Sequence, residues 1–398
     1  MTSGKFLKDY ALLCGCWTFL LVGCGAAPQV QHPASPPPPR SAGAVLDAGG
    51  LELERACVAG DAQRCSALAD RLENGQGLAA DPAKAAVFFR ESCRQGDQAA
   101  CGKLGVLLRG GRGVGRDELR AAELLSGACK AGDMPSCSEW GVCYERGWGQ
   151  GKSVDLARKL YAMACDKHDP SGCSRLGALY ADGIGVAVER DKAAELFQFS
   201  CDRGYASGCI HLGALLEQGD TNARDRQRAM ELYTKSCELQ PGNGCFMLGL
   251  LHQRGMGMAV DSDKALVFFK KACDAGHAPA CAFAALIWDH GTPTQPKDPQ
   301  QALALRKRAC EYGSANTCAQ LGDACEAAKE RCPATELAED FVRACLGGHT
   351  LSCIRAGQLI EAGLGVEKDP LRAAELYRRA CHAGERLACE QLKGNPSK

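Results

Sequence analysis

Residues 173–201 read CSRLGALYADGIGVAVERDKAAELFQFSC. Apolar residues at helical spacing run up to Gly183, a second such run follows Asp191, and a cysteine stands at each end. Glycine takes the positive φ at which many helices stop at little cost, so Gly183 predicts a turn between two helices. The stretch therefore predicts one helix pair, and no period-two strand pattern competes with it.

The cysteines indicate that this unit is repeated along the chain, because they fall into pairs eight residues apart. The pairs recur every 36 residues, apart from one step of 37 and one of 35. They are Cys57 with Cys65, Cys93 with Cys101, Cys129 with Cys137, Cys165 with Cys173, Cys201 with Cys209, Cys237 with Cys245, Cys273 with Cys281, Cys310 with Cys318, Cys345 with Cys353 and Cys381 with Cys389. A fixed period of this length is typical of a solenoid.

Other positions keep the same period. The fourth residue after the second cysteine is small, namely Ala69, Gly105, Gly141, Gly177, Gly213, Gly249, Ala285, Gly322 and Gly357. Helix-capping residues follow the glycine turn at Asp81, Asp117, Ser153, Asp225, Asp261 and Asp369. Large residues precede the next cysteine by four, namely Phe89, Leu125, Tyr161, Phe197, Tyr233, Phe269, Phe341 and Tyr377. The pattern predicts an all-α, α/α superhelical solenoid of about nine 36-residue helix pairs.

These residues resemble the Sel-like repeat (SLR), a relative of the tetratricopeptide repeat. The signature Leu-Gly-x-x-Tyr-x-x-Gly-x-Gly-Val stands complete at residues 176–186, and residues 191–194 match the start of the second helix. The cysteine pairs resemble the cysteine-rich branch, the Helicobacter cysteine-rich protein (Hcp) family. The resemblance covers residues 51–392, which we take as the solenoid, with a polar tail at 393–398.

The N-terminus is expected to direct export. Lys5 and Lys8 precede an apolar run that is too short for a confident transmembrane helix and suits a signal peptide. The run ends in residues 21–24, which resemble a bacterial lipobox, so residues 1–23 are read as a lipoprotein signal and Cys24 as the lipidated residue. Ordinary secretion is the alternative. Residues 24–50 are read as the lipid anchor and a proline-rich tether, and Gly25 favours the outer membrane by the family rule.

In an exported chain, the cysteine pairs predict disulfides that staple each helix pair to the next. Zinc is the alternative, but seven intervening residues fit no cysteine knuckle. Cys325 and Cys332 lie where the glycine turn is missing, which predicts an extra bridge. Cys143 has no partner and aligns with core leucines, so we expect a buried, inert thiol, with a redox role as the alternative.

The sequence offers no recognisable catalytic chemistry. Lys plus Arg and Asp plus Glu both number 47, so there is no basic excess for nucleic acid. The eight histidines are scattered without ligand spacing, and the S-x-x-K, K-T-G and H-E-x-x-H motifs are missing. We expect no metal and no cofactor, and we name no catalytic residue.

One position of each unit varies while the packing positions repeat. It lies two residues after the second cysteine and comprises Lys103, Glu139, Arg175, His211, Met247, Phe283, Gln320 and Arg355. Stacked helix pairs form an extended concave surface, which the first helices line in the family, so these residues are candidates for a binding groove. The alternative is an unconstrained solvent face.

The expected function is that of an exported, lipid-anchored scaffold that binds a protein or peptide at the cell envelope. A monomer is expected, held at the membrane through its lipid alone, on either face of the outer membrane, with secretion as the alternative. The Hcp resemblance implies a second function, a peptidoglycan-fragment or penicillin-binding protein with weak β-lactamase activity. A purely structural spacer is a third.

Overall fold

The computed structural model describes residues 47–75, 80–218, 223–255, 259–327 and 334–393, and in these it has twenty helices and no strand. In chain order the helices are α1 (Ala48–Val58), α2 (Ala62–Asn74), α3 (Pro82–Arg94), α4 (Gln98–Gly110), α5 (Glu118–Lys130), α6 (Met134–Arg146), α7 (Val154–Asp166), α8 (Pro170–Asp182), α9 (Arg190–Asp202), α10 (Ala206–Glu217), α11 (Ala223–Leu239), α12 (Pro241–Arg254), α13 (Ser262–Asp274), α14 (Ala278–His290), α15 (Pro299–Glu311), α16 (Ala315–Ala327), α17 (Ala334–Leu346), α18 (Thr350–Ala362), α19 (Pro370–His382) and α20 (Arg386–Lys393). This confirms the predicted all-α solenoid.

Each repeat unit is an even-numbered first helix followed by an odd-numbered second helix, from α2/α3 to α18/α19. The units therefore make nine pairs, and the single helices α1 and α20 flank them at the two ends. Helix α1 begins at Ala48, earlier than the expected start of the solenoid at residue 51, because Asp47 caps it by accepting a hydrogen bond from Gly50 N at 2.6 Å.

The helix ends follow the residue types at the turns. Gly75, Gly111, Gly147, Gly183, Gly255 and Gly363 end first helices in the left-handed conformation. Asp81, Asp117, Ser153, Asp261 and Asp369 cap the second helices, each accepting a backbone N–H three residues ahead. The expected cap at Asp225 is wrong, because residues 223 and 224 are already helical and Asp225 lies inside α11.

The glycine in the middle of a first helix makes room for the large residue of its own second helix. A methyl group on Gly141 would stand 2.4 Å from the ring of Tyr161, and one on Gly249 would stand 2.5 Å from the ring of Phe269. The same contact recurs at Gly177, Gly213, Gly322 and Gly357. The two repeating sequence positions are therefore the two sides of a single packing contact.

The second glycine of the turn lets successive units stack. Gly113 lies against the backbone of Pro82, and Gly149 against the carbonyl of Glu118, at positions where a Cβ would come within 2.2 Å. In both cases the neighbour belongs to the start of the second helix in the preceding unit. Glycine is thus required where one backbone meets another.

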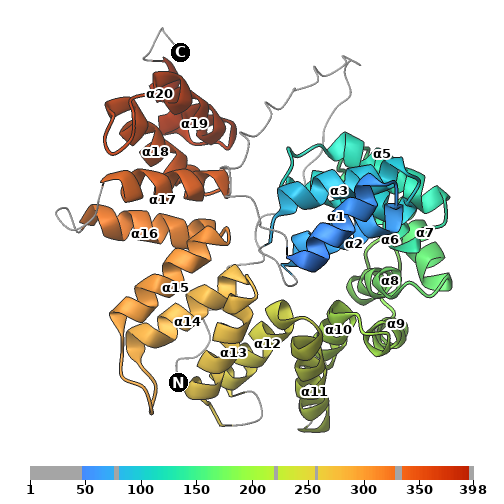
Figure 1. Cartoon of the computed structure of the whole chain (residues 1–398). Coiled ribbons are helices and arrows are strands. Elements are labelled where there is room, and N and C mark those ends of the chain that lie inside the picture. The colour runs from blue at the N-terminus through green and yellow to red at the C-terminus, as the bar shows by residue number, and fades with distance from the viewer. Residues whose placement is uncertain (1–46, 76–79, 219–222, 256–258, 328–333, 394–398) are drawn as a thin grey trace, which may run out of the picture.

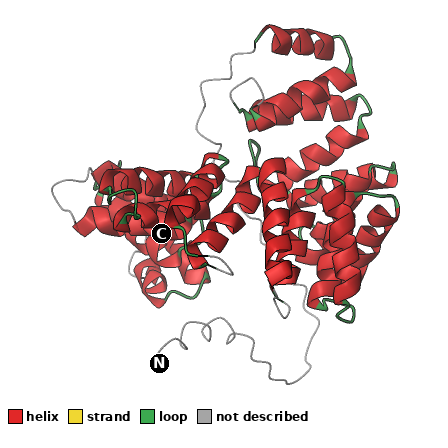
Figure 2. Ribbon diagram, turned by 90° about the horizontal axis from the view of Figure 1, so that it is seen from below, coloured by secondary structure: helices red, strands yellow, loops and turns green. Residues whose placement is uncertain are grey.

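The units follow an open arc (Figure 1), with α1–α7 on the right, α10–α13 at the bottom and α15–α20 on the left. From α4 to α12, successive first helices contact one another directly, while the second helices of this range stand farther apart. The first helices therefore form the inner layer of this part of the arc. The core is a row of small clusters along this path. Figure 2 shows the arrangement of the helices from below.

Candidate binding surface on the first helices

Disulfides fix the turns that present the first helices. All ten predicted bridges between cysteines eight apart are formed, with Cα–Cα distances of 4.5–4.8 Å. The second cysteine of each bridge lies near the start of an even-numbered helix, at Cys65, Cys101, Cys137, Cys173, Cys209, Cys245, Cys281, Cys318, Cys353 and Cys389. Each bridge therefore ties the start of one helix to the end of the helix before it.

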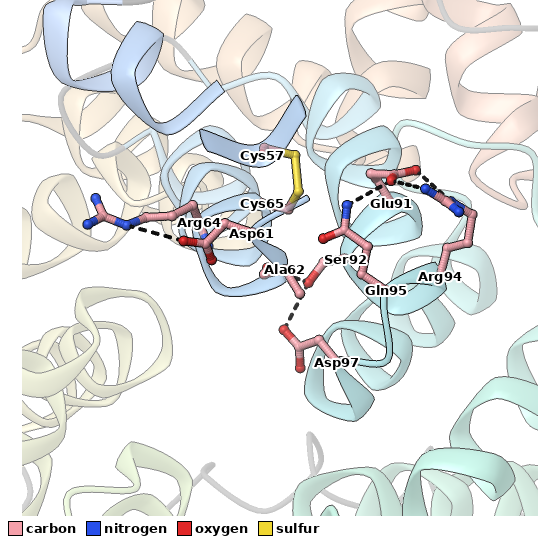
Figure 3. Close-up of a disulfide and its surroundings, with 10 residues drawn as sticks. All are labelled: Cys57, Asp61, Ala62, Arg64, Cys65, Glu91, Ser92, Arg94, Gln95 and Asp97. Atoms are coloured by element: carbon pink, nitrogen blue, oxygen red, sulfur yellow. Dashed lines mark hydrogen bonds and ion pairs between the residues drawn. A yellow bond between two sulfur atoms is a disulfide. The ribbon is translucent and has the colours of Figure 1, made fainter. Parts of the chain in front are cut away.

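Figure 3 shows the Cys57–Cys65 bridge, which joins the end of α1 to the first turn of α2. Asp61 caps α2 between the two cysteines by accepting from Arg64 N at 3.1 Å. The bridge and the cap thus act on the same short turn.

A serine near the end of the second helix of this unit, α3, reinforces the turn. The Ser92 hydroxyl lies 2.7 Å from the carbonyl oxygen of Ala62 and 2.9 Å from the carboxylate of Asp97 (Figure 3). Ser200 repeats the contact with the carbonyl of Pro170 at 2.7 Å. The bonds to the two carbonyl oxygens run from the end of a second helix to the start of the first helix of the same unit, so they hold one disulfide turn against the next.

The cysteines outside these ten bridges are only partly described. Cys325 is disulfide-bonded, while its expected partner Cys332 lies outside the described residues. Cys143 is a free thiol with no exposed surface. Burial raises the pKa of this thiol, which keeps it protonated and unreactive at neutral pH. Cys24 and the signal lie outside the described residues as well.

The eight variable residues lie one on each first helix, from Lys103 on α4 to Arg355 on α18. Further residues share this face at positions five and eight after the second cysteine, since a step of three keeps to one side of a helix. Asp70 and Leu286 stand at the first of these positions, and Arg109 and Glu326 at the second. The same three-residue spacing could have identified them from the sequence.

The N-terminal part of the surface is charged, and its charges pair across units. Lys103 Nζ binds the Asp70 carboxylate at 2.6 Å. The carboxylate of Glu139 lies 2.7 Å from Arg109 and 2.8 Å from Arg175, so two cations share one anion. Burial opposes the ionisation of Glu139, but Arg175 and Arg109 hold its pKa below the ordinary value. These ion pairs join α2, α4, α6 and α8, and we call Asp70, Lys103, Arg109, Glu139 and Arg175 the charged section.

A serine–histidine pair follows on adjacent repeats. Ser174 on α8 lies 3.1 Å from Nδ1 of His211 on α10. Burial, with Arg175 nearby, lowers the pKa of His211, so the imidazole is neutral at neutral pH. Ser174 is only 1% exposed, so its hydroxyl is shielded from any substrate. We assign the contact to the packing of α8 on α10 rather than to nucleophilic catalysis.

The next part of the surface is apolar. Met247 on α12 and Phe283 on α14 are half-buried and pack against the largest core cluster. The ring of Phe283 lies 5.4 Å from Phe246 and 5.3 Å from Phe269, and Leu286 beside it is 47% exposed. We call Phe246, Met247, Phe283 and Leu286 the apolar section.

The last two candidate residues are polar and more exposed. Gln320 on α16 is exposed, and Arg355 on α18 pairs with Glu326 at 2.5 Å.

In the described part of the chain, no group of three or more His, Cys, Asp or Glu side chains is placed to hold a metal ion. Nor does any described helix have the length and apolar character to span a bilayer.

Solved structures with this architecture provide the comparison. A protective antigen of uropathogenic Escherichia coli strains with an SLR fold is 26% identical, over 85% of this chain and 73% of its own, with a TM-score of 0.41. A Sel1 repeat protein from Oxalobacter formigenes is 23% identical, over 77% of this chain and 89% of its own, with a TM-score of 0.48. No curated protein matches this chain.

The family model of the Sel1 repeat matches eight segments of the sequence. They are residues 65–97, 98–133, 135–169, 170–205, 206–241, 242–277, 278–314 and 350–385. The matched segments coincide with the disulfide-linked helix pairs and leave out residues 315–349, where the glycine turn is replaced. The chain belongs to the Sel1 repeat family.

Proposed function

We propose that this protein is an exported, lipid-anchored scaffold that binds an extended segment of a partner protein along the inner surface of its first helices. Sel1 repeat proteins are in general protein-interaction modules. The observation that carries the proposal is the change along one surface from the charged section to the apolar section.

The two sections differ in what they can recognise. The charged section offers the guanidinium groups of Arg109 and Arg175, which share Glu139 and so can still attract a carboxylate of a partner. The apolar section leaves Leu286 47% exposed beside the half-buried ring of Phe283, and such neighbouring exposure favours a covering partner. An extended segment with acidic residues at one end and apolar residues at the other would match both.

Export is supported by the number of disulfides. Ten bridges in the described residues need an oxidising compartment to form and persist. We propose Cys24 as the lipidated residue, residues 1–23 as the signal, and residues 24–46 as the anchor and tether, which is shorter than the expected 24–50 because α1 begins at Ala48. Metabolic labelling with an alkyne palmitate tests this, since Cys24→Ala should abolish labelling of the exported protein.

Site-specific photo-crosslinking tests the binding surface. A benzophenone amino acid replaces Phe283 on the first helix α14 or, as a control, the 63% exposed Val267 on the second helix α13. We expect one discrete adduct from position 283 in the native envelope and none from position 267. Equal crosslinking from both positions, or none from position 283, would remove the proposed surface.

The β-lactamase alternative is tested separately. The resemblance to the Hcp family is its only support, since the Ser174–His211 pair has a shielded hydroxyl. Nitrocefin turnover by the oxidised protein, compared with a Ser174→Ala variant, measures it. We expect no turnover above background, and turnover that the variant loses would establish the hydrolase instead.

A further inference from the structure

Contacts between neighbouring first helices run in a continuous row across the charged section. The residues that make them stand one or two positions after the second cysteine of a disulfide. Glu139 on α6 pairs with Arg175 on α8 at 2.8 Å, and Ser174 on α8 contacts His211 on α10 at 3.1 Å. The row therefore crosses α6, α8 and α10 at one level instead of following any one helix.

The same level continues into the apolar section. Ile210 on α10 packs against the core cluster to which α12 contributes. The ring of Phe246 on α12 lies 5.4 Å from the ring of Phe283 on α14. Direct contacts of α8 with α10 and of α10 with α12 agree with this order. A partner chain laid along the row would therefore meet Arg175 first and the apolar section two helices later.

The number of helices between these two places sets their separation. Arg175 on α8 and Met247 on α12 are two helix-to-helix steps apart, with α10 between them. Packed helices have axes about 8–10 Å apart, so the axes of α8 and α12 stand roughly 16–20 Å apart. An extended chain advances about 3.3 Å per residue, so about five or six residues span this distance.

At this level α10 presents no charge to a partner. Burial lowers the pKa of His211, so its imidazole is neutral at neutral pH. Its Nδ1 is engaged by Ser174, and its ring lies 5.1 Å from the ring of Phe197. Ala214, three residues further along α10, is small and half-buried. A charged residue in the middle of the partner segment would therefore find no counter-charge on this face.

The charged end is organised to receive a carboxylate. The guanidinium of Arg109 lies 5.4 Å from the ring of Trp148 and pairs with Glu139, which also binds Arg175. The side chain of Arg175 is 30% exposed. A guanidinium carries five N–H donors, so Arg175 can bind a carboxylate of the partner while it keeps Glu139.

The apolar end is lined by aromatic rings. The imidazole of His277 lies 4.7 Å from the ring of Phe246, and the ring of Phe283 lies 5.3 Å from that of Phe269. Burial lowers the pKa of His277, so this imidazole is neutral at neutral pH too. Aromatic rings favour offset or edge-on contacts with a further ring. A phenylalanine of the partner therefore suits this end, beside the exposed Leu286.

We infer that the partner segment carries a carboxylate and an aromatic side chain about six residues apart, with uncharged residues between them. The carboxylate binds Arg175, and the uncharged middle of the segment crosses α10. The aromatic side chain lies against Phe246, Met247 and Phe283. This spacing rests on the proposed binding surface and specifies the chemistry of the partner that fits it.

Calorimetric titration of the oxidised chain tests the spacing with capped peptides of serine and glycine. Each peptide carries one glutamate and one phenylalanine, standing two, six or twelve residues apart. We expect a spacing of two to bind at least about tenfold more weakly than six, because it reaches only one end of the row. A spacing of twelve should bind about threefold more weakly, because a longer loop costs more entropy.

Equal affinities at the three spacings, or no binding at any of them, would overturn the inference. Crosslinking from position 283 distinguishes this outcome from a failure of the proposed function. A discrete adduct there without a spacing effect removes the spacing alone, whereas a missing adduct removes the binding surface as well.

A charge substitution tests the carboxylate end. In the natural chain, replacing the glutamate of the best peptide by glutamine should weaken binding about fivefold. In Arg175→Gln the two peptides should bind alike. Arg308→Gln is the matched control, since Arg308 pairs with Asp274 at 2.8 Å on the second helix α15, and it should keep the natural preference. An undiminished preference for glutamate in Arg175→Gln would place the carboxylate elsewhere and overturn the inference.

Discussion

At the residue scale, the repeating positions are explained by contacts between pairs of residues rather than by the helix propensity of each residue alone. Each glycine in the middle of a first helix costs intrinsic helix stability, about 1 kcal/mol relative to alanine. Glycine is nevertheless required there, because a ring from the second helix occupies the space that a larger side chain would need, as the Tyr161 ring does at Gly141. The sequence showed both positions, but their meeting depends on how the two helices fold back.

Gly141→Ala should destabilise the protein by roughly 1–3 kcal/mol, because its methyl group would stand 2.4 Å from the Tyr161 ring. Gly127→Ala is the matched control, since it lies in helix α5 with no atom within 4 Å of the added carbon. It should stabilise by about 0.5–1 kcal/mol through helix propensity. Urea unfolding of the two oxidised variants measures both, and equal effects would contradict the packing assignment.

The buried tyrosines predict a loss of stability in alkali. Burial and the hydrogen bond to the Glu145 carboxylate, at 2.8 Å, raise the pKa of Tyr161, and Tyr233 behaves alike beside Glu217. Tyrosines of the unfolded chain ionise near pH 10. Below that pH the stability is unaffected, and it falls as the pH rises above it because only the unfolded state loses these protons.

Urea midpoints measured from pH 8 to 11 test this expectation. The Tyr161→Phe variant should show a shallower fall than the natural chain above pH 10, since one raised pKa is removed. If the urea midpoint falls equally steeply with pH in the two proteins, the Tyr161 hydroxyl has the same pKa in the folded and the unfolded state.

At the element scale, each helix end depends on a few residues. The glycine turns and five caps of the second helices were predicted, because local backbone preference decides them. The cap at Asp225 was wrong, and the caps Asp61, Asp97, Asp133 and Asp169 of the first helices were not predicted. Those four aspartates stand four residues before the second cysteine, and this fixed spacing could have predicted them as caps from the sequence.

Removing one bridge should loosen one turn. Replacing Cys165 and Cys173 together by alanine opens a loop of about nine residues and should cost roughly 2.5 kcal/mol by the chain-entropy estimate. Hydrogen exchange should rise at the junction of α7 and α8 and stay unchanged at α13 and α14, because each repeat contacts only its neighbours. A uniform rise along the chain would contradict this local role.

At the scale of the whole molecule, the arc arises from small steps between like units. Direct contacts between the first helices from α4 to α12 place these helices on the inner side. Most of the charged section and the residues Phe246 and Met247 of α12 therefore lie along this layer, and Phe283 on α14 adjoins it through its ring contact with Phe246. The unit around α14 departs from the rest, and there the turn at Gly291 is not left-handed.

Full reduction tests how far the array depends on its bridges. Thermal unfolding followed by circular dichroism should shift to lower temperature and become broader in a strong reductant, because units held only by nearest-neighbour packing unfold in succession. The oxidised protein in the same buffer without reductant is the control. Superimposable curves would show that packing alone holds the array together.

The sequence by itself determined the helix pairs, their number, the ten cysteine pairs eight residues apart and the burial of Cys143, because each follows from local backbone preference or a short, fixed spacing. Only the tertiary structure decided which side chains meet between units. The Arg109–Glu139–Arg175 cluster, the shielding of Ser174 and the row of contacts from Glu139 to Phe283 depend on how one unit rotates against the next. That rotation is the sum of many side-chain contacts between neighbours, and no single spacing in the chain encodes it.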